Sequence, residues 1–550
     1  MTERSTGPMK WYGWGDPERR LPLSDDAVAM LRAEVGEGRP DGPASLESVV
    51  VPSPRPLPPA LAETVGPAAV LTGHEHRVRR AAGRGYPDLV RLRAGRLDDA
   101  PDAVVLPGSA AEVARVLEIC GREGIGVVPF GGGTSVVGGV DPVRGRFERL
   151  ITLDLRRLRG AEVDRTSLTA TLGPGLRGPE AEEALAEHGV TMGHFPQSFE
   201  YATIGGFAAA RSAGQASSGY GRFDELVTSV RLVSPAGELS TLETPHTAAG
   251  PALRQLVLGS EGVLGVITQV TARVRPVPER RRYDAWMAAD FASGAAIVRA
   301  LAQSDALPDV VRLSDEAETR VSLGMSGTNG GKRALLGTYL RLRRRDHGCI
   351  LICGWEGGAE AVERRRAVSG RVLRSARAAA LGGSPGRAWE RGRYDGPYLR
   401  DELLDLGYMV ETLETAHTWT RLQELHDEVR AAVGAALATQ GTPGIVMCHL
   451  SHAYRDGASL YFTFIAPRRP DAELEQWRLA KAAASEAIVK SGATITHHHG
   501  VGRDHVPYMR AEVGDVGIEA LRAVKERLDP AGIMNPGKLL PTNAYGGSAA

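Results

Sequence analysis

Short apolar runs alternate with amphipathic stretches through residues 98–278. Apolar residues that follow one another without a polar face predict short buried strands, and these are expected at 103–106, 150–155, 168–172, 227–234 and 238–241. Ser109, followed three residues later by Glu112, forms a capping-box pattern, which predicts a helix that continues to about residue 122. A second helix is expected at 179–188. The pattern indicates one unit that mixes strands and helices.

The pattern changes at about residue 279, where the arginines at 280–282 mark a boundary. Strands and helices then alternate, and they are expected at 285–289, 292–303, 310–313, 349–353, 360–380 and 516–527. In the run 457–464, alternation places Tyr461 on one face of a strand and Phe462 on the other. A tyrosine in such a strand usually serves packing, so the pattern alone does not make Tyr461 catalytic.

Length and composition limit the classes of protein to consider. The 550 residues are too many for one hydrophobic core, so two or three domains are expected. Lysine plus arginine and aspartate plus glutamate both number 66, so no overall charge favours nucleic acid as a partner. The four cysteines do not make a disulfide framework, and no apolar run is long enough to span a bilayer. A cytoplasmic location is expected.

Residues 126–140 carry the most distinctive local pattern. A short apolar strand runs into Pro129, and three consecutive glycines at 131–133 and two hydroxyl residues follow. Glycines expose a row of backbone N–H groups, which suits a phosphate or pyrophosphate, and a tight turn between two strands is the alternative. No lysine follows as in a Walker A loop, and strand-like valines at 136–140 argue against a helix opened by a dinucleotide motif.

Three more glycine-rich loops follow, at 194–206, 217–221 and 259–267. A unit with four such loops is expected to bind a large ligand along its backbone. In order and spacing, the loops resemble the FAD-binding domain of the vanillyl-alcohol oxidase / p-cresol methylhydroxylase superfamily, and a glycine-rich scaffold without a nucleotide is the alternative. The resemblance implies non-covalent FAD and an α+β fold: a two-part FAD-binding domain of the p-cresol methylhydroxylase type plus an α/β cap domain with a mostly antiparallel sheet.

The same resemblance implies a division of the chain and a set of cofactor residues. The expected parts are an N-terminal arm and helical region (1–96), the FAD-binding domain (97–278), a cap or substrate domain (279–490) and a C-terminal segment that returns to the flavin (491–550). The implied cofactor-binding residues are Pro129, Phe130, Gly131, Gly132, Gly133, Thr134, Ser135, His194, Gln197, Ser198, Ala202, Thr203, Gly206, Arg211, Ser212, Glu261, Gly262, Val266 and Ile267.

Histidines cluster in two places in the second half of the chain. His497, His498 and His499 are consecutive and precede a Gly-Val-Gly turn. Neighbouring side chains in a strand-like run point to opposite sides, so the three are not expected to bind one metal ion together. The His449 and His452 pair has no carboxylate at ligand spacing. No metal site is therefore predicted.

Five motifs narrow the resemblance to the alkyldihydroxyacetonephosphate synthase family, in its bacterial type. They are the aromatic cluster at 9–15, Val-Arg-Leu-Ser-Asp at 311–315, Tyr-Leu-Arg-Asp at 398–401, Leu-Tyr-Phe at 460–462 and His-His-His-Gly-Val-Gly at 497–502. The resemblance implies a flavoenzyme that exchanges the acyl chain of acyl-dihydroxyacetone phosphate for a fatty alcohol, without net redox change. It implies that Tyr461 is the acid/base, that His497, His498 and His499 line the site, and that Arg400 and Arg312 are the cations near substrate and phosphate.

Other functions remain open. A D-lactate- or glycolate-type dehydrogenase or oxidase is the main alternative, although Tyr461 stands where that branch carries a second metal-binding histidine. A flavoprotein scaffold without chemistry is a third. His449 stands where eukaryotic synthases carry a basic residue, which is a departure from the family pattern. A homodimer is expected, and the basic run 341–345 is either a solvated face or a contact with an anionic membrane surface.

Overall fold

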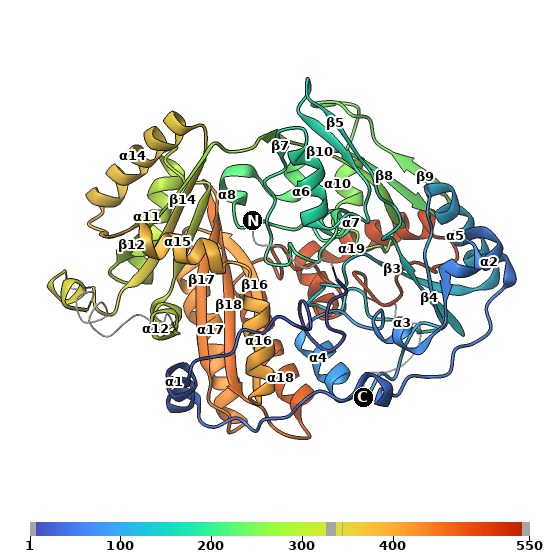
Figure 1. The fold of residues 1–550 in the computed structure, drawn as a ribbon, viewed down its shortest axis with the longest axis horizontal. Helices are drawn as coiled ribbons and strands as arrows, with labels where there is room; N and C mark the ends of the chain where they lie inside the picture. Colours follow the sequence, from blue (N-terminus) through green and yellow to red (C-terminus); the bar gives the residue numbers. More distant parts are fainter. Residues whose placement is uncertain (1–6, 326–336, 344, 542–550) are drawn as a thin grey trace.

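The computed structural model describes residues 7–325, 337–343 and 345–541, and two bodies lie side by side in it (Figure 1). The body drawn on the right contains two sheets from the first half of the chain, and the C-terminal helix α19 (Met509–Leu528) lies with them. The body on the left is built on one large sheet. Within the described ranges, no helix combines the length and the apolar character needed to cross a membrane.

The first sheet holds the predicted phosphate loop at the end of one of its strands. Its strand order is β1 (Val70–Leu71), β2 (Ala103–Val105), β4 (Arg149–Asp154) and β3 (Ile125–Phe130), with β2, β4 and β3 parallel. Helix α5 (Ala110–Glu123) connects β2 to β3. Ser109 caps this helix as predicted, because its Oγ accepts from Glu112 N–H at 3.1 Å. The Glu112 carboxylate accepts from Gly108 N–H at 2.7 Å and not from the Ser109 N–H, so the capping box is only half formed.

The second sheet is antiparallel and supports the other glycine loops. Its order is β5 (Ala161–Asp164), β6 (Thr169–Leu172), β10 (Val266–Arg273), β8 (Val227–Ser234) and β9 (Gly237–Ser240). A short ladder joins β7 (Val190–Thr191) to β11 (Arg275–Pro276). The helices of this body are α2 (Pro59–Val65), α3 (His74–Val78), α6 (Gly178–Ala186), α7 (Ile204–Ala209), α8 (Ser217–Tyr220), α9 (Phe223–Leu226) and α10 (Leu253–Val257).

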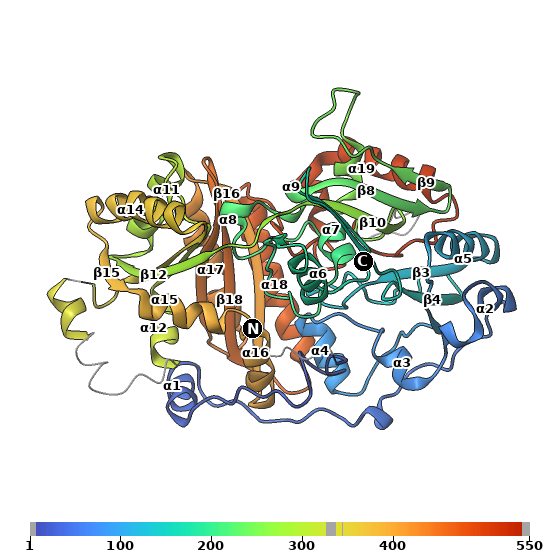
Figure 2. The ribbon, with the colours of Figure 1, turned by 45° about the horizontal axis from the view of Figure 1, so that its top comes forward.

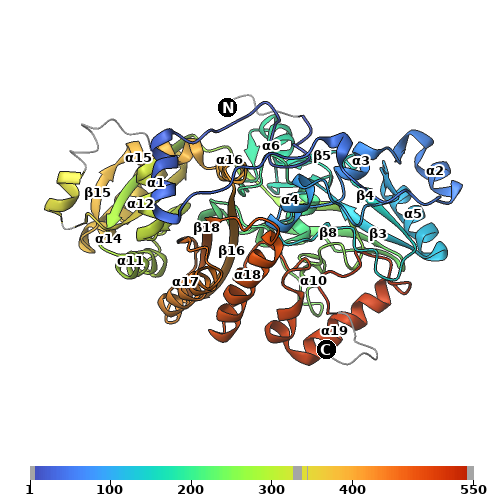
Figure 3. The same ribbon diagram turned by 90° about the horizontal axis from the view of Figure 1, so that it is seen from below.

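The large sheet is antiparallel throughout. Its order is β15 (Ala379–Gly382), β12 (Arg280–Ala288), β14 (Cys349–Gly357), β13 (Val310–Ser314), β17 (Ile445–Ala453), β18 (Gly457–Pro467) and β16 (Tyr408–Thr418). Four helices pack on one face: α11 (Phe291–Gln303), α14 (Ala359–Ser375), α17 (Leu422–Thr439) and α18 (Glu473–Lys490), which lie in a row in Figure 3. Phe462 and Phe464 are fully buried in that core. Tyr461, with the opposite parity on β18, therefore lies on the face away from the four helices.

Two terminal segments cross to distant elements. Helix α1 (Asp25–Val35) packs against α12 (Glu316–Met325) on the second face of the large sheet, and α4 (Tyr86–Arg93) joins the core under its helices (Figure 2). After α19 the chain returns to β3, where Val127 N–H donates to Ile533 O at 2.9 Å. The remaining helices are η1 (Leu46–Ser48), η2 (Pro67–Ala69), α15 (Gly383–Gly392), α16 (Gly396–Asp405) and η3 (Val506–Tyr508).

Most predicted strands and helices are present, and three predictions differ from the structure. The helix predicted at 360–380 ends at Ser375, and strand β15 follows it at Ala379. The valines at 136–140 form no strand, because Gly138 has a φ of 69° and Ser135 Oγ accepts from Gly139 N–H at 2.9 Å, so the chain turns. The last helix begins at Met509 rather than at 516, and it runs across a non-helical Gly514. The cysteines at 349 and 353 lie buried on strand β14, as predicted.

Candidate active site

Tyr461 and the consecutive histidines come together beside the second face of the large sheet. On β18, Tyr461 stands between Glu414 of β16 and His449 of β17 in the strand register. The His449 ring stacks on the Tyr461 ring, with centroids 4.8 Å apart and planes 17° apart. The centroids of His498 and His499 lie 6.1 and 5.4 Å from that of Tyr461. The structure therefore brings together the tyrosine and the histidines that the resemblance implied.

His452, on β17, belongs to the same cluster. Its ring lies 5.2 Å from those of both His497 and His498. One ring nitrogen from each of these three residues lies within 4.8 Å of the other two. Neighbouring histidines were expected to point to opposite sides of a strand. His499 does lie outside this group of three, but His497 and His498 both belong to it, because the chain there is a turn and not a strand. That the protein carries no metal stays a prediction.

A cavity opens between the two bodies at this cluster. Strands β13, β17 and β18 supply most of its wall, and the loops before α7 and α8, helix α15 and the histidine turn supply the rest. The lining residues are Gln197, Ala213, Gln215, Val310, Val311, Arg312, Trp389, His449, Ser451, His452, Tyr461 and His498. The predicted flavin-side residue Gln197 and the predicted catalytic residues Tyr461, His498 and Arg312 thus share one cavity.

Burial sets the protonation of the cluster. It lowers the pKa of His452, His497 and His498, and lowers that of His499 to about 3, so the imidazoles are neutral at pH 7. Burial also raises the pKa of Tyr461 to about 12. The phenol enters a reaction protonated, and the imidazoles enter it as free bases.

The two predicted cations have different surroundings. Arg312 donates to the Glu318 carboxylate at 2.8 Å, and the same carboxylate oxygen lies 3.0 Å from His449 Nδ1. Arg400, on α16, donates one Nη to Arg84 O at 2.7 Å. Its Nε and other Nη are shielded from solvent and find no partner among the described residues. Arg312 is therefore charge-balanced by a neighbour, whereas Arg400 keeps donors free for an anion.

The glycine loops fit a dinucleotide. A Cβ on Gly131 would lie 2.3 Å from Thr203 Oγ1, and one on Gly132 would lie 2.0 Å from Tyr201 O, so only glycine allows this approach of the loops. The backbone N–H groups of Gly132 and Gly133 donate to no acceptor in the described part of the chain. Free backbone N–H groups at the end of a parallel strand suit a pyrophosphate.

Several other predicted cofactor side chains are already engaged by the protein. Arg211 donates to the carbonyls of Leu258 and Gln255, and the Glu261 carboxylate accepts from Val501 and Gly502 N–H at 2.6 and 2.7 Å. His194 is buried, with Nε2 3.1 Å from Ser212 Oγ. The other predicted positions lie around them: Pro129 and Phe130 at the end of β3 and Gly133, Thr134 and Ser135 after it, Ser198, Ala202 and Thr203 before α7 and Gly206 in it, and Gly262, Val266 and Ile267 before and in β10.

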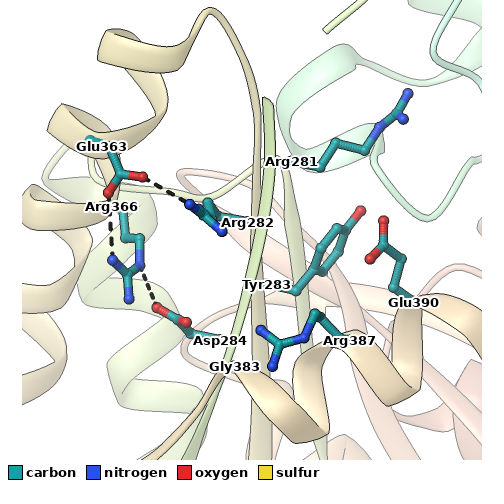
Figure 4. A pocket seen from close by; sticks show the side chains of 9 residues that line it. All are labelled: Arg281, Arg282, Tyr283, Asp284, Glu363, Arg366, Gly383, Arg387 and Glu390. Carbon is teal, nitrogen blue, oxygen red and sulfur yellow. Dashed lines mark hydrogen bonds and ion pairs between the residues drawn. The ribbon is translucent and has the colours of Figure 1, made fainter. Parts of the chain in front are cut away.

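A second hollow lies between β12, α14 and α15 (Figure 4). Four of its charged residues bind one another: Arg366 lies 2.6 Å from Asp284 and 3.5 Å from Glu363, which also pairs with Arg282 at 3.4 Å. It shares no lining residue with the imidazole cavity. We therefore interpret it as an ion-pair network and not as the reaction site.

Sequence reasoning missed Glu414 and Glu318, and it named His452 without assigning it to the site. Each glutamate is buried against histidines of the cluster. A usable signal existed for Glu414, because a charged residue within the apolar run 408–416 is expected to be buried only with partners. The partners themselves lie more than 80 residues away along the chain, at 496–499.

Comparison with known proteins agrees with this geometry. A model of the FAD binding domain matches residues 101–243, and a model of the C-terminal domain of FAD linked oxidases matches residues 277–539. The alkyldihydroxyacetonephosphate synthase of Dictyostelium discoideum is 32% identical over 97% of this chain and 94% of that protein. A solved structure of an alkyldihydroxyacetonephosphate synthase superposes with a TM-score of 0.84 at 30% identity, covering 96% of this chain and 99% of that one.

A more distant relative represents the alternative function. The glycolate oxidase subunit GlcD of Bacillus subtilis (strain 168) is 26% identical over 81% of this chain and 90% of that protein. The matches confirm the predicted fold class, a FAD-binding part combined with an antiparallel cap sheet, and they confirm FAD as the cofactor.

Proposed function

Because the chain belongs to the alkyldihydroxyacetonephosphate synthase family, we propose that it exchanges the acyl chain of acyl-dihydroxyacetone phosphate for a fatty alcohol in ether-lipid synthesis. It is an FAD-dependent enzyme. The observation that carries the proposal is the cavity in which Tyr461 and His498 face the loop of Gln197. When bound, the flavin supplies a ring position that can hold the substrate carbon covalently between departure of the acid and arrival of the alcohol.

The phosphate of the substrate is assigned to Arg400. Its unpartnered Nε and Nη donors suit a phosphate, which a guanidinium binds through two parallel hydrogen bonds. Arg84 lies against it, is buried, and also has an unpartnered Nε. A buried cation (Arg84) and a half-buried one (Arg400), neither of them within ion-pair distance of a carboxylate in the described part of the chain, favour a dianion at this place.

The C1 proton of the substrate is assigned to Tyr461 and His498. With a pKa of about 12, Tyr461 is a donor at neutral pH. His498 is a neutral imidazole and lines the same cavity, so it is the proton acceptor, and His497 and His499 complete the wall of the site. Arg312 acts indirectly. It binds Glu318, which also binds His449 and so holds the His449 ring against the Tyr461 ring.

FAD is placed along the glycine loops, with Gly131–Ser135 at the pyrophosphate and Gln197 near the ring. No bond from the protein to the flavin is part of the proposal. The division at residues 97–278, 279–490 and 491–550 is proposed with it, since β12 opens the large sheet at Arg280 and the chain after α19 returns to β3.

One experiment separates the two candidate functions. Purified enzyme is mixed with acyl-dihydroxyacetone phosphate and labelled hexadecanol, and a parallel sample receives D-lactate or glycolate with a dye acceptor. Label in an ether product, with no bleaching of the dye, supports the synthase. Bleaching without ether product would replace it by the 2-hydroxy-acid oxidoreductase.

We further propose that the enzyme is a homodimer that contacts a membrane surface in the cytoplasm. The membrane contact is supported by one short segment, in which Leu342 is 80% exposed and is flanked by the exposed Arg341 and Arg343. A basic and apolar edge of this kind suits anionic lipid. Light scattering measures the oligomer, and sedimentation with phosphatidylserine vesicles measures the contact, which Leu342→Glu should weaken.

A further inference from the structure

A buried carboxylate lies beneath the consecutive histidines. Glu414 of β16 is 1% exposed. Its two oxygens accept hydrogen bonds from the backbone N–H groups of His497, His498 and His499 at 2.5, 3.0 and 2.8 Å, and from Thr496 Oγ1 at 2.6 Å. Three of these bonds reach Oε1 and one reaches Oε2. One side chain therefore fixes the backbone that presents all three imidazoles.

Glu414 also sets the charge of the cluster. Burial would raise its pKa, but the three imidazoles and the Thr496 hydroxyl together lower it well below the usual value, so it is an anion. His498 Nδ1 lies 3.5 Å from its Oε2, closer than His499 Nδ1, which lies 3.9 Å from Oε1. His498, unlike His499, lines the cavity.

The groups that face His498 from other elements leave this charge unbalanced. His452 of β17, Tyr461 of β18 and His194 are all neutral at pH 7, as are His497 and His499 on its own segment. Arg222, before α9, is the cation that acts on His498, and it is bonded to Asp224 at 3.0 Å. The cluster thus holds one negative charge, on Glu414, beside the neutral imidazoles of His452, His497, His498 and His499, and it can accept one proton.

We propose that Glu414 is a positioning residue that holds the histidine turn in place and supplies the counter-charge when His498 accepts the C1 proton of the substrate. In that step the C1–H bond breaks, an N–H bond forms on His498, and the electron pair passes to the neighbouring carbonyl of the substrate as an enolate. The reverse transfer returns the proton. The proposal rests on the proposed function where it names the substrate as the source of the proton. The ion pair between Glu414 and protonated His498 does not depend on that function.

Two variants separate charge from shape. Glu414→Gln keeps the length of the side chain and one acceptor but removes the charge, whereas Glu414→Asp keeps the charge and withdraws it by one methylene. If charge matters, we expect Gln to lose roughly 10²-fold in kcat with KM changed less than about threefold, and Asp to lose less. If Glu414 served packing alone, the Asp variant would lose more kcat than the Gln variant. Glu363→Gln, in the outer ion-pair network, is the matched control and should leave kcat unchanged.

A second readout does not depend on turnover. Diethyl pyrocarbonate modifies only the neutral imidazole, so the pH midpoint of His498 modification in the holoenzyme, mapped by mass spectrometry, reports its protonation. Loss of the Glu414 charge lowers that midpoint by roughly one to three pH units. An unchanged midpoint in Glu414→Gln overturns the proposal even where kcat falls.

Failure of the synthase assignment and failure of the Glu414 proposal give different results. If wild-type enzyme forms no ether product but the midpoint shifts, the synthase assignment fails and the ion pair stands. If Glu414→Gln does not fold, which FAD content and the unfolding midpoint reveal, Glu414→Asp decides: a partial shift supports the counter-charge, and a midpoint equal to wild type contradicts it.

Discussion

At the scale of single residues, the site consists of neutral groups beside two isolated charges. The imidazoles and the phenol are uncharged at pH 7 because burial penalises their ions, whereas Glu414 is an anion. Arg400 carries the permanent charge of a guanidinium. Such an arrangement suits proton transfer within the cavity, since bases with free electron pairs stand next to a donor. It also makes each side chain separately testable.

Tyr461→Phe tests the donor. The phenyl ring can still stack on His449, so we expect FAD content and stability to be retained while kcat falls by roughly 10²-fold or more. Ether-product formation measures kcat, and absorbance at the flavin band measures FAD. The matched control is Tyr339→Phe, whose hydroxyl donates to Ala380 O outside the cavity. Full activity in Tyr461→Phe would remove the phenol from the mechanism.

Arg400→Ala tests the phosphate assignment. Loss of a charged hydrogen-bond donor costs about 1.5–3 kcal/mol of binding, so we expect KM for acyl-dihydroxyacetone phosphate to rise roughly 10- to 100-fold. KM for the fatty alcohol should change little, because it carries no phosphate. Arg421→Ala, an exposed arginine on the same body, is the control. An equal rise in both KM values would argue for general damage to the cavity.

At the scale of elements, register and packing place the catalytic groups. Because side chains alternate along β18, Phe462 and Phe464 pack against the four helices, and Tyr461 lies on the opposite face of the sheet. The β17 register then sets His449 opposite Tyr461, and the β16 register does the same for Glu414. A shift of one residue in any of these ladders would exchange the two faces and dismantle the site.

Glu182, on α6, offers a test of a carboxylate shielded from water. Glu182 accepts from Met192 N–H at 3.1 Å and from the Thr191 hydroxyl, and burial raises its pKa to about 7. Because the pKa is higher in the folded than in the unfolded state, Glu182 costs stability as pH rises from about 4.5 to 7. Glu182→Gln should therefore match wild type near pH 5 and exceed it at pH 8, by up to about 1.4 kcal/mol per pH unit.

The measurement is urea unfolding at pH 5, 6.5 and 8, read from the same transition in both proteins. Glu183→Gln, at an exposed neighbouring position, is the control and should follow wild type at every pH. A difference between Glu182→Gln and wild type that does not vary with pH would show that packing, and not the buried charge, is responsible.

At the scale of the whole molecule, the cavity exists only because two bodies meet. Gln197 and Gln215 come from one body, and Tyr461, His449 and Arg312 come from the other. The glycine loops lie on the first body alone. FAD should thus bind to the first body and be covered by the second.

FAD release tests how the cofactor is held. We expect acid or heat to free all of the FAD, because the proposed contacts are backbone N–H groups and no covalent bond. The flavin absorbance of the supernatant after precipitation, compared with that of the pellet, measures this. Added FAD should also raise the unfolding midpoint, since a ligand of the native state stabilises it. Flavin that stays on the denatured chain would contradict the non-covalent assignment.

Local physical chemistry determined much of this protein from the sequence alone. The helix at 110–123, the buried strands and the glycine loop were predictable because capping, apolar runs and the lack of side chains act over a few residues. The tertiary structure decided which distant groups share a site. Glu414 meets residues 496–499, Arg400 meets Arg84, and His452 joins His497 because sheet register and the packing of two bodies bring them together. No local pattern in the sequence shows such long-range contacts, because they depend on the free-energy minimum of the whole folded chain and not on interactions between residues adjacent in the sequence.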